Sequence, residues 1–282
     1  MPTTHTSLNN VTAEKHPPHG LLKSTAPFPK LETNQAVIQE VFSSIQGEGL
    51  HAGERQVFVR VAHCHLHCAY CDTPMTTTRG DCAVETQPGS KQWVAVPGLQ
   101  RVEDTEMLIA GLIAQAPHHS VSFTGGEPLL YPYYLASLME RIQRLGVKTY
   151  LETSGTQPHS LAKVLQFIDI ISMDVKLPSS TKESERWQQH ADFYRTAKQA
   201  PQVELFVKVV VNHDTTLEEL THLTSIITDI QTPIYLQPET SLLEDGVLNI
   251  TASHLLNLQG FLARHFSTVR VLPQTHKMMK IS

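Results

Sequence analysis

Strand-like and helix-like segments alternate along most of this chain, and this alternation constrains its fold more than any other feature. The predicted strands are apolar, β-branched runs at residues 35–42, 56–62, 119–124, 148–153, 168–175, 203–211, 233–237 and 268–272. Strands that alternate with helices predict a parallel sheet with helices on its outer face. The pattern therefore indicates an α/β fold, in the form of a partial, open β/α barrel.

The predicted helices lie between these strands, at residues 102–116, 134–145 and 251–265. One more helix begins where Thr215 and Glu218 have the spacing of a capping box. The apolar residues of the second helix fall on one face, which consists of Leu135, Leu138, Met139, Ile142 and Leu145.

The chain divides into an extension and one domain. Residues 1–34 are rich in Pro, Thr, His and Asn and lack apolar periodicity, so we expect a disordered N-terminal extension. We expect residues 35–282 to form a single domain. Within it, the polar stretch at 76–101, with its Gly and Pro residues, predicts a loop or insertion, and residues 182–199 predict a polar helix or an insertion.

Composition excludes several classes of protein. The 282 residues are 40% apolar, which is enough for a globular core. No run approaches the roughly 18 apolar residues of a membrane helix, and the N-terminus does not resemble a secretory signal. A net charge of −5 argues against a nucleic-acid partner. We therefore expect a cytoplasmic protein with no membrane and no nucleic-acid partner.

Polar clusters follow the predicted strands at the point where each one ends. They lie at residues 125–128, 152–155, 174–176, 212–214, 237–239 and 273–276. In barrel folds the catalytic residues gather at the C-terminal ends of the strands. The six clusters therefore predict one site at one rim of the barrel.

Three of the four cysteines stand in one short stretch, Arg60–Thr73, as Cys64, Cys68 and Cys71 with the spacing C-x3-C-x2-C. Clustered cysteines in a large chain without an export signal indicate a metal site. Zinc is one interpretation, closed by a fourth ligand among Cys82, His63, His65 and His67. A structural zinc knot normally pairs two C-x2-C arms, however, and this chain has no second arm. Three thiolates on one loop favour a [4Fe–4S] cluster with one iron left open.

The cysteine loop, Cys64-x3-Cys68-x-Tyr70-Cys71, resembles the cluster loop of radical S-adenosylmethionine (SAM) enzymes, and Gly125-Gly126-Glu127-Pro128 resembles their second motif. Alone, Gly-Gly-Glu-Pro would be read as a turn into a helix. The resemblance implies that SAM chelates the open iron through its amino and carboxylate groups. It also implies that reductive cleavage of SAM gives a 5′-deoxyadenosyl radical, which removes a hydrogen atom from the substrate.

Further segments resemble one family of that superfamily, the 7-carboxy-7-deazaguanine synthases of queuosine and deazapurine biosynthesis. They lie at residues 44–49, 58–60, 71–73, 151–156, 176–180, 235–237 and 270–276. The resemblance implies conversion of 6-carboxy-5,6,7,8-tetrahydropterin to 7-carboxy-7-deazaguanine with release of ammonia. It also implies that SAM acts as a regenerated cofactor, that Thr73 is the protein ligand of a Mg2+ ion, that flavodoxin or ferredoxin donates electrons, and that the protein is a homodimer.

The substrate-binding residues follow from this resemblance and from the chemistry of a carboxypterin. Arg60 can bind its carboxylate with a planar fork. Glu48 and Gln46 can match the N–H groups of its pyrimidine edge. The remaining candidates are Thr124, Glu152 and His276, and Glu152 can face either the substrate or SAM.

The expected SAM-binding residues are Tyr70, Gly126, Glu127, Ser154, Lys176 and Gln237. In this set Glu127 would meet the amino group of SAM, Lys176 would neutralise its carboxylate, and Ser154 would bond a ribose hydroxyl. The chain departs from the family pattern at Asp174-Val175-Lys176, which replaces Ser-Pro-Lys, and at Pro74, which follows the Mg2+ ligand.

Two alternative functions remain open from the sequence. A glycyl-radical-enzyme activase also uses C-x3-C-x2-C, but it would not need Gln46, Glu48 or His276. A metal-stabilised scaffold or electron carrier without catalysis would form no 5′-deoxyadenosine when it is reduced with SAM.

Overall fold

A single eleven-stranded sheet forms the frame of the protein. The structure is a computed structural model that describes residues 31–73, 80–240, 247–279 and 281. Most of the expected N-terminal extension, residues 76–79 of the first predicted insertion, and Pro74 lie outside the described residues. The strands are β1 (Gln35–Ile45), β2 (Arg55–Val61), β3 (Asp81–Glu85), β4 (Trp93–Pro97), β5 (Leu99–Arg101), β6 (Ser120–Gly125), β7 (Lys148–Thr153), β8 (Ile170–Asp174), β9 (Glu204–Val211), β10 (Ile234–Pro238) and β11 (Val269–Val271).

The strand order confirms the open, mainly parallel barrel. It runs β11-β10-β9-β8-β7-β6-β2-β1-β3-β4, with β5 on β1. Every neighbouring pair from β11 to β2 is parallel, whereas β1 is antiparallel to β2. The two edges, β11 and β4, do not pair with each other among the described strands.

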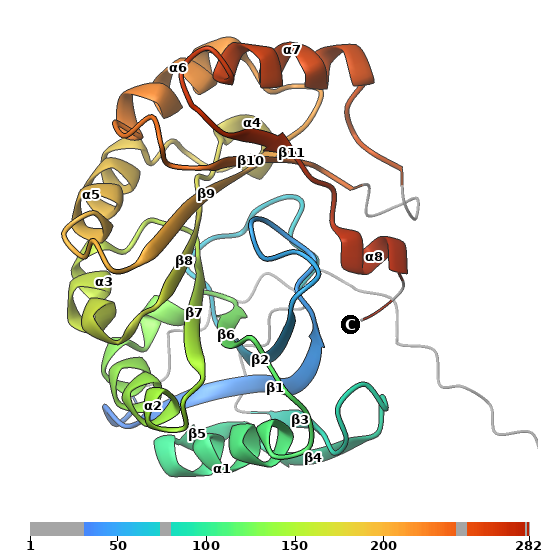
Figure 1. Ribbon diagram of the computed structural model, residues 1–282, viewed down its shortest axis with the longest axis vertical. Coiled ribbons are helices and arrows are strands. Elements are labelled where there is room, and N and C mark those ends of the chain that lie inside the picture. Colours follow the sequence, from blue (N-terminus) through green and yellow to red (C-terminus); the bar gives the residue numbers. More distant parts are fainter. Residues whose placement is uncertain (1–30, 74–79, 241–246, 280, 282) are drawn as a thin grey trace, which may run out of the picture.

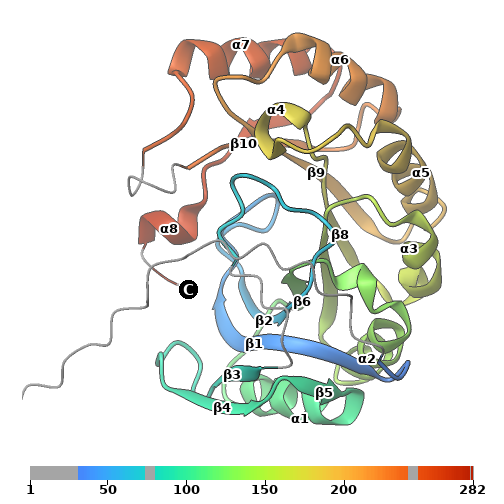
Figure 2. The ribbon, with the colours of Figure 1, turned by 180° about the vertical axis from the view of Figure 1, so that it is seen from behind.

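Helices cover the outer side of this curved sheet (Figures 1 and 2). They are α1 (Val102–Ile113), α2 (Pro132–Arg144), α3 (Pro158–Val164), α5 (Trp187–Ala197), α6 (Leu217–Ile226) and α7 (Ala252–Leu262). Two shorter helices, α4 (Pro178–Thr181) and α8 (Thr275–Met279), lie elsewhere, and α8 stands on the concave side. No helix in the described ranges has both the length and the apolar character that a membrane crossing requires.

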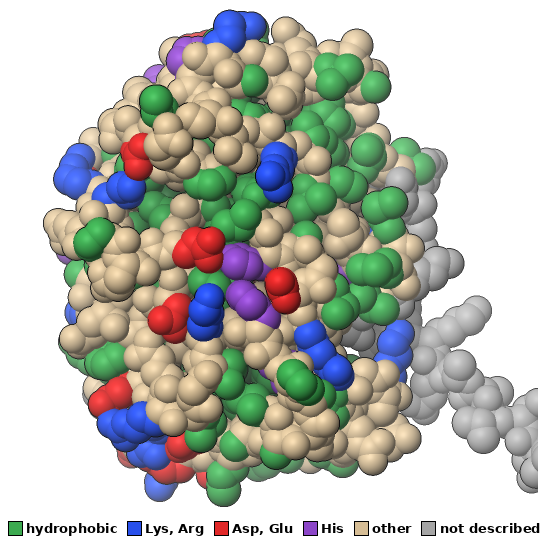
Figure 3. Space-filling view, in the orientation of Figure 1, with side chains coloured by type: hydrophobic (Ala, Val, Ile, Leu, Met, Phe, Trp, Pro, Cys, Tyr) green, Lys and Arg blue, Asp and Glu red, His purple; other side chains and the backbone are tan. Residues whose placement is uncertain are grey.

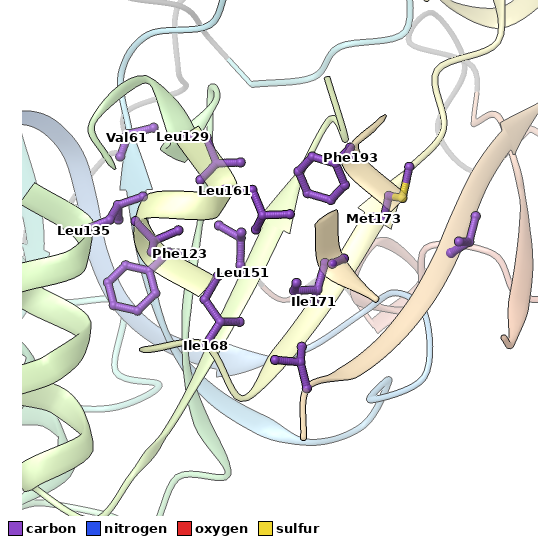
Figure 4. Packing of buried hydrophobic residues seen from close by; sticks show 14 of the residues in the cluster. Val61, Phe123, Leu129, Leu135, Leu151, Leu161, Ile168, Ile171, Met173 and Phe193 are labelled. Carbon is purple, nitrogen blue, oxygen red and sulfur yellow. The ribbon is translucent and has the colours of Figure 1, made fainter. Parts of the chain in front are cut away.

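Strand alternation separates the hydrophobic core from the concave face. Odd-numbered residues of β2 and β6–β9, such as Val59, Phe123 and Met173, are buried against the helices, and Figure 4 shows this packing between sheet and helices. Even-numbered residues of the same strands point to the opposite face, where Arg60 is in register with Thr124 and Asp174 with Lys208. The main apolar core therefore lies outside the barrel. The inner face carries the polar side chains together with a smaller apolar cluster that includes Tyr150 and Phe206.

The prediction of a loop at 76–101 is wrong for the described part of that stretch, which forms β3, β4 and β5. Strand β3 is parallel to β1 and antiparallel to β4, and a turn with Gly89 and Lys91 at positive φ joins β3 to β4. The polar composition hid these strands because β4 is almost wholly exposed. Their position depends on the free edge of β1, which is distant in sequence.

Three helix predictions need correction or refinement. The capping box is one residue later than predicted, because Thr216 and Glu219 exchange the two hydrogen bonds. Leu145 does not belong to the buried face of α2, since it follows the last helical residue and is 43% exposed. The stretch 182–199 contains α5, which buries His190 and Phe193 and connects β8 to β9.

Candidate active site

A cavity of about 430 Å³ lies at the C-terminal ends of the parallel strands. Every predicted site residue lines it except Glu127, which lies behind the wall. Five of the six polar rim clusters contribute to the lining. The exception is 212–214, where Asn212 bonds to Glu239 and Asp214 pairs with Lys182 at the surface. One rim therefore brings together segments from Gln46 to His276, as the strand-end clusters predicted.

The cysteine loop leaves β2 and presents Cys64, Cys68 and Cys71 to this cavity. The backbone N–H of Leu66 donates to the Sγ of Cys64 at 3.4 Å. The loop is held from behind by the segment after β8, since Ala69 N donates to Thr181 O at 2.9 Å and His67 N to Glu183 at 3.0 Å. The three thiols are thus mounted on a loop that a second barrel segment supports.

The environment of Cys64 and Cys68 disfavours free thiolates. Burial raises the pKa of Cys64 to about 12, and the nearby Glu127 carboxylate adds to this effect. Burial also raises the pKa of Cys68, although Lys176 opposes the change. Cys64 and Cys68 therefore carry their protons at neutral pH when no metal is bound, and a coordinated metal would remove those protons.

The donor set fits a [4Fe–4S] cluster better than a single zinc ion. In the described residues, no three Cys, His, Asp or Glu side chains meet closely enough to hold one metal ion. Cys82 packs in the hydrophobic core on β3 and lines no part of the cavity. Three thiols spread along one loop instead suit an iron–sulfur cube, where each thiolate binds a different iron.

Gly126 places the second motif against the cysteine loop. Its N–H donates to Val61 O at 2.9 Å, and a Cβ on Gly126 would lie 1.9 Å from the carbonyl oxygen of His63. No side chain fits there without backbone movement. The contact explains why a glycine is required, and it joins the end of β6 to the residue before Cys64.

The carboxylate of Glu127 is bonded to the protein behind the cavity wall. Glu127 is fully buried, and its carboxylate accepts hydrogen bonds from Thr153 Oγ1 at 2.7 Å and from both the N–H and the Oγ of Ser154, at 2.9 and 2.5 Å. Leu129 N donates to it as well. Glu127 therefore shapes the cavity by holding Ser154, which itself lines the wall.

Lys176 lies beside the cysteine loop. Its Nζ donates to Tyr70 Oη at 2.9 Å and to Asp174 Oδ2 at 2.8 Å. Although burial opposes its charge, Asp174 raises the pKa of Lys176 well above its usual range. Lys176 is thus a fixed cation on the cavity wall.

His190 supports Lys176 from α5. Its Nε2 accepts from Lys176 N at 3.2 Å, and its Nδ1–H donates to Gly155 O at 2.9 Å. Burial lowers the pKa of His190 to about 4. The neutral ring therefore ties the strand ends of β7 and β8 together.

Arg60 and Thr73 stand at the two ends of the cysteine loop. Arg60 Nη1 donates to Thr73 Oγ1 at 3.3 Å, and Arg60 Nε donates to Glu40 at 2.8 Å. Nearby, Thr124 donates to Glu152 at 2.7 Å, and burial raises the pKa of that carboxyl. Part of the Arg60 guanidinium is therefore hydrogen-bonded within the protein, and the rest faces the cavity.

The C-terminal segment closes the cavity beside the Gln46–Glu48 turn. Thr275 N donates to Gly47 O at 3.0 Å, and the ring of His276 packs so closely on Gly47 that a Cβ there would lie 1.9 Å from Nδ1. Lys277 pairs with Asp72 at 2.6 Å. The side-chain amide of Gln46 is hydrogen-bonded within the protein, because it accepts from Glu48 N and donates to Gln56.

Three residues of the site were not predicted individually from the sequence. They are Lys208 on β9, Gln274, and Lys277, which pairs with Asp72 in the cysteine loop. Lys208 contacts the Glu48 carboxylate, and Gln274 donates to the same carboxylate at 2.7 Å. A signal for Lys208 was present, since it is the single lysine in the apolar run Val203–Val211. Because side chains alternate along a strand, Lys208 lies on the inner face. The sequence of that run does not identify its partner.

The chain is similar to known proteins in both sequence and fold. The family model for the radical SAM superfamily matches residues 59–222. A 7-carboxy-7-deazaguanine synthase from Geobacter sulfurreducens is 37% identical over 86% of this chain and 97% of its own, and one from Archaeoglobus fulgidus is 31% identical over 88% and 99%. The crystal structure of QueE from Escherichia coli has the same fold, with a TM-score of 0.58, 22% identity, and coverage of 85% of this chain and 94% of its own.

Proposed function

Because this chain belongs to the 7-carboxy-7-deazaguanine synthases of the radical SAM superfamily, we propose that it converts 6-carboxy-5,6,7,8-tetrahydropterin to 7-carboxy-7-deazaguanine and ammonia. The reaction uses a [4Fe–4S] cluster and SAM. The observation that carries the proposal is the single cavity that joins the three thiols to Arg60 and Glu48. A carboxypterin needs both a cation for its carboxylate and acceptors for its N–H groups, and this cavity offers both.

Cys64, Cys68 and Cys71 would hold the cluster, and their loop leaves one iron for SAM. When bound, the cluster and SAM supply the radical that takes a hydrogen atom from the substrate. The residues assigned to SAM are Tyr70, Gly126, Ser154, Lys176 and Gln237, with Glu127 acting through Ser154. Lys176 neutralises the SAM carboxylate, and the hydroxyl of Ser154 meets a polar group of the cofactor.

The substrate lies between the cysteine loop and the C-terminal segment in this proposal. Arg60 binds its carboxylate, Thr73 supplies an oxygen ligand to Mg2+ near the same carboxylate, and Glu48 accepts from its pyrimidine edge. Gln46, Thr124, Glu152 and His276 complete the pocket. Mg2+ suits a site with a hydroxyl, a carboxylate and water, because it retains much of its hydration.

The chain's wider context also belongs to the proposal. We propose that residues 35–282 act as one catalytic domain, that the enzyme works in the cytoplasm as a homodimer, and that flavodoxin or ferredoxin reduces the cluster. The relatives' names do not favour a glycyl-radical-enzyme activase. An electron carrier without catalysis has no use for a carboxylate-binding cation in the same cavity.

Turnover tests the proposal directly. The protein is reconstituted anaerobically with iron and sulfide, reduced, and incubated with SAM, Mg2+ and the carboxypterin. We expect 7-carboxy-7-deazaguanine by mass spectrometry, with SAM largely regenerated. Formation of 5′-deoxyadenosine without any deazapurine would overturn the proposed substrate. No 5′-deoxyadenosine under any condition would instead favour the scaffold or electron carrier.

A further inference from the structure

Lys208 belongs to a row of four largely buried charges on the concave face of the sheet, in the order Glu48, Lys208, Asp174 and Lys176. Its Nζ contacts the Glu48 carboxylate and lies 3.4 Å from Asp174 Oδ2, which also accepts from Lys176. The side chains of Lys208 and Asp174 are only 10% and 8% exposed. Two cations and two acids therefore alternate across the cavity floor, and removal of one leaves its neighbour buried without a counter-charge.

Glu48 is held at both of its oxygens. Oε2 accepts from Lys208, and Oε1 accepts from Gln274 at 2.7 Å and from Gln237 at 3.2 Å. An ionised carboxylate has about four lone-pair sites. Three are filled by the protein, so one site on Oε2 remains for a ligand in the cavity that Glu48 lines.

Lys208 is the cation that decides the charge of Glu48. Burial alone would raise the pKa of Glu48, but Lys208, with smaller contributions from Gln274 and His276, lowers it to about 2. The other charged groups that face this pair are Lys176, Glu152 and Asp174, and the charge of Glu48 raises the pKa of Glu152. His276 also approaches from α8, but burial lowers its pKa.

We propose that Lys208 is a positioning residue, which keeps Glu48 ionised and turned toward the cavity so that it accepts from an N–H donor of the substrate. This inference rests on the proposed function, because the ligand it describes is the aminopyrimidine edge of a pterin. A protonated Glu48 would present an O–H and would select a ring acceptor instead. Lys208 thus sets the hydrogen-bond polarity of the substrate pocket without touching the substrate.

The test measures binding of 6-carboxypterin, by quenching of its fluorescence, to the reconstituted protein without reductant, and KM for the carboxypterin in turnover. Both are followed from about pH 5.5 to about pH 8.5 in wild type and in Lys208→Met. We expect Lys208→Met to bind on the order of tenfold or more weakly near pH 6, and to regain affinity as the pH rises and Glu48 ionises. Wild type should lack this acid-side loss, because its Glu48 is ionised throughout.

Three further variants separate positioning from folding. Lys208→Arg keeps the charge and should keep the wild-type pH profile. The double variant Glu48→Gln/Lys208→Met removes both charges, so it should fold, lose the new pH dependence and bind like Glu48→Gln alone to within about threefold. Lys198→Met is the matched control, since Lys198 pairs with Asp229 at the surface and is remote from the cavity.

Each outcome decides the question. A Lys208→Met protein with wild-type affinity and pH profile overturns the inference. A double variant that binds tenfold more weakly than Glu48→Gln also overturns it, because Lys208 would then contact the ligand itself. If wild type binds the pterin but makes no deazapurine, the proposed function fails while the positioning role is still measured by binding.

Discussion

Arg60 Nη1 donates a hydrogen bond to Thr73 Oγ1 at 3.3 Å, and so joins the two ends of the loop that carries the three cysteines. The same guanidinium is fixed by Glu40 on β1. The proposed carboxylate-binding cation, the proposed Mg2+ ligand and the cluster loop therefore share one support. Movement of any of them should affect the others.

Thr73→Val and Thr73→Ser separate the two uses of this hydroxyl. Valine keeps the size and removes the oxygen, so we expect it to abolish the stimulation of turnover by Mg2+ and to weaken the hold on Arg60. Serine keeps the oxygen and should retain at least about a third of the wild-type rate. Initial rates against Mg2+ concentration measure the effect, and equal Mg2+ stimulation of the valine variant would contradict the ligand assignment.

Alanine at Cys64, Cys68 or Cys71 should each abolish the bound cluster, because no other described thiol lines the cavity. The matched control is Cys82→Ala, which removes a buried sulfur from β3 and should cost about 1 kcal/mol of stability while the cluster stays. Iron and sulfide analysis with the visible absorption spectrum reports the result. Loss of the cluster in the Cys82 variant would show that the ligand set is wrong.

Gly126→Ala should destabilise the protein by about 2–4 kcal/mol, because its Cβ would be forced against the backbone of His63. The cysteine loop should shift with it, so reconstitution should yield less iron. Gly111→Ala is the control, since Gly111 lies in α1 with open space around its Cβ direction and should gain about 0.5–1 kcal/mol. Urea unfolding of both variants tests the pair, and an unchanged midpoint for Gly126→Ala would refute the clash.

His190 should make the protein sensitive to acid. Its folded pKa of about 4 lies below the ordinary value of 6.5, so between these pH values the unfolded chain binds the proton and the folded chain does not. Stability from this group is therefore full above pH 6.5 and falls as the pH drops toward 4, by a total on the order of 3 kcal/mol.

Urea midpoints at about pH 7 and about pH 5 measure this loss, and His190→Gln should show a smaller drop than wild type. His159→Gln, on the exposed surface of α3, is the control and should lose stability like wild type. An identical drop in wild type and His190→Gln would rule out His190 as the source.

Much of the candidate site could be predicted because its motifs are local. Cys64, Cys68 and Cys71 lie within one turn-rich loop, and strand ends on a parallel sheet must meet at one rim. The direction in which each side chain points was harder to predict from the sequence. Glu127 stands in a recognisable motif, yet its carboxylate turns to Ser154, directly after the neighbouring strand β7. Figure 3 shows basic and acidic side chains interspersed on one face of the molecule, an arrangement that composition alone does not give.

The sequence by itself determined the alternation of strands and helices, the polar clusters at the strand ends, and the thiol loop, because periodicity and short motifs are properties of neighbouring residues. Tertiary structure alone decided that β3 pairs with β1, that residues 212–214 leave the cavity, and that Lys208 meets Glu48 from 160 positions away. These depend on which distant segments share a sheet edge or a cavity wall. Such choices are made by burial and charge compensation across the whole domain.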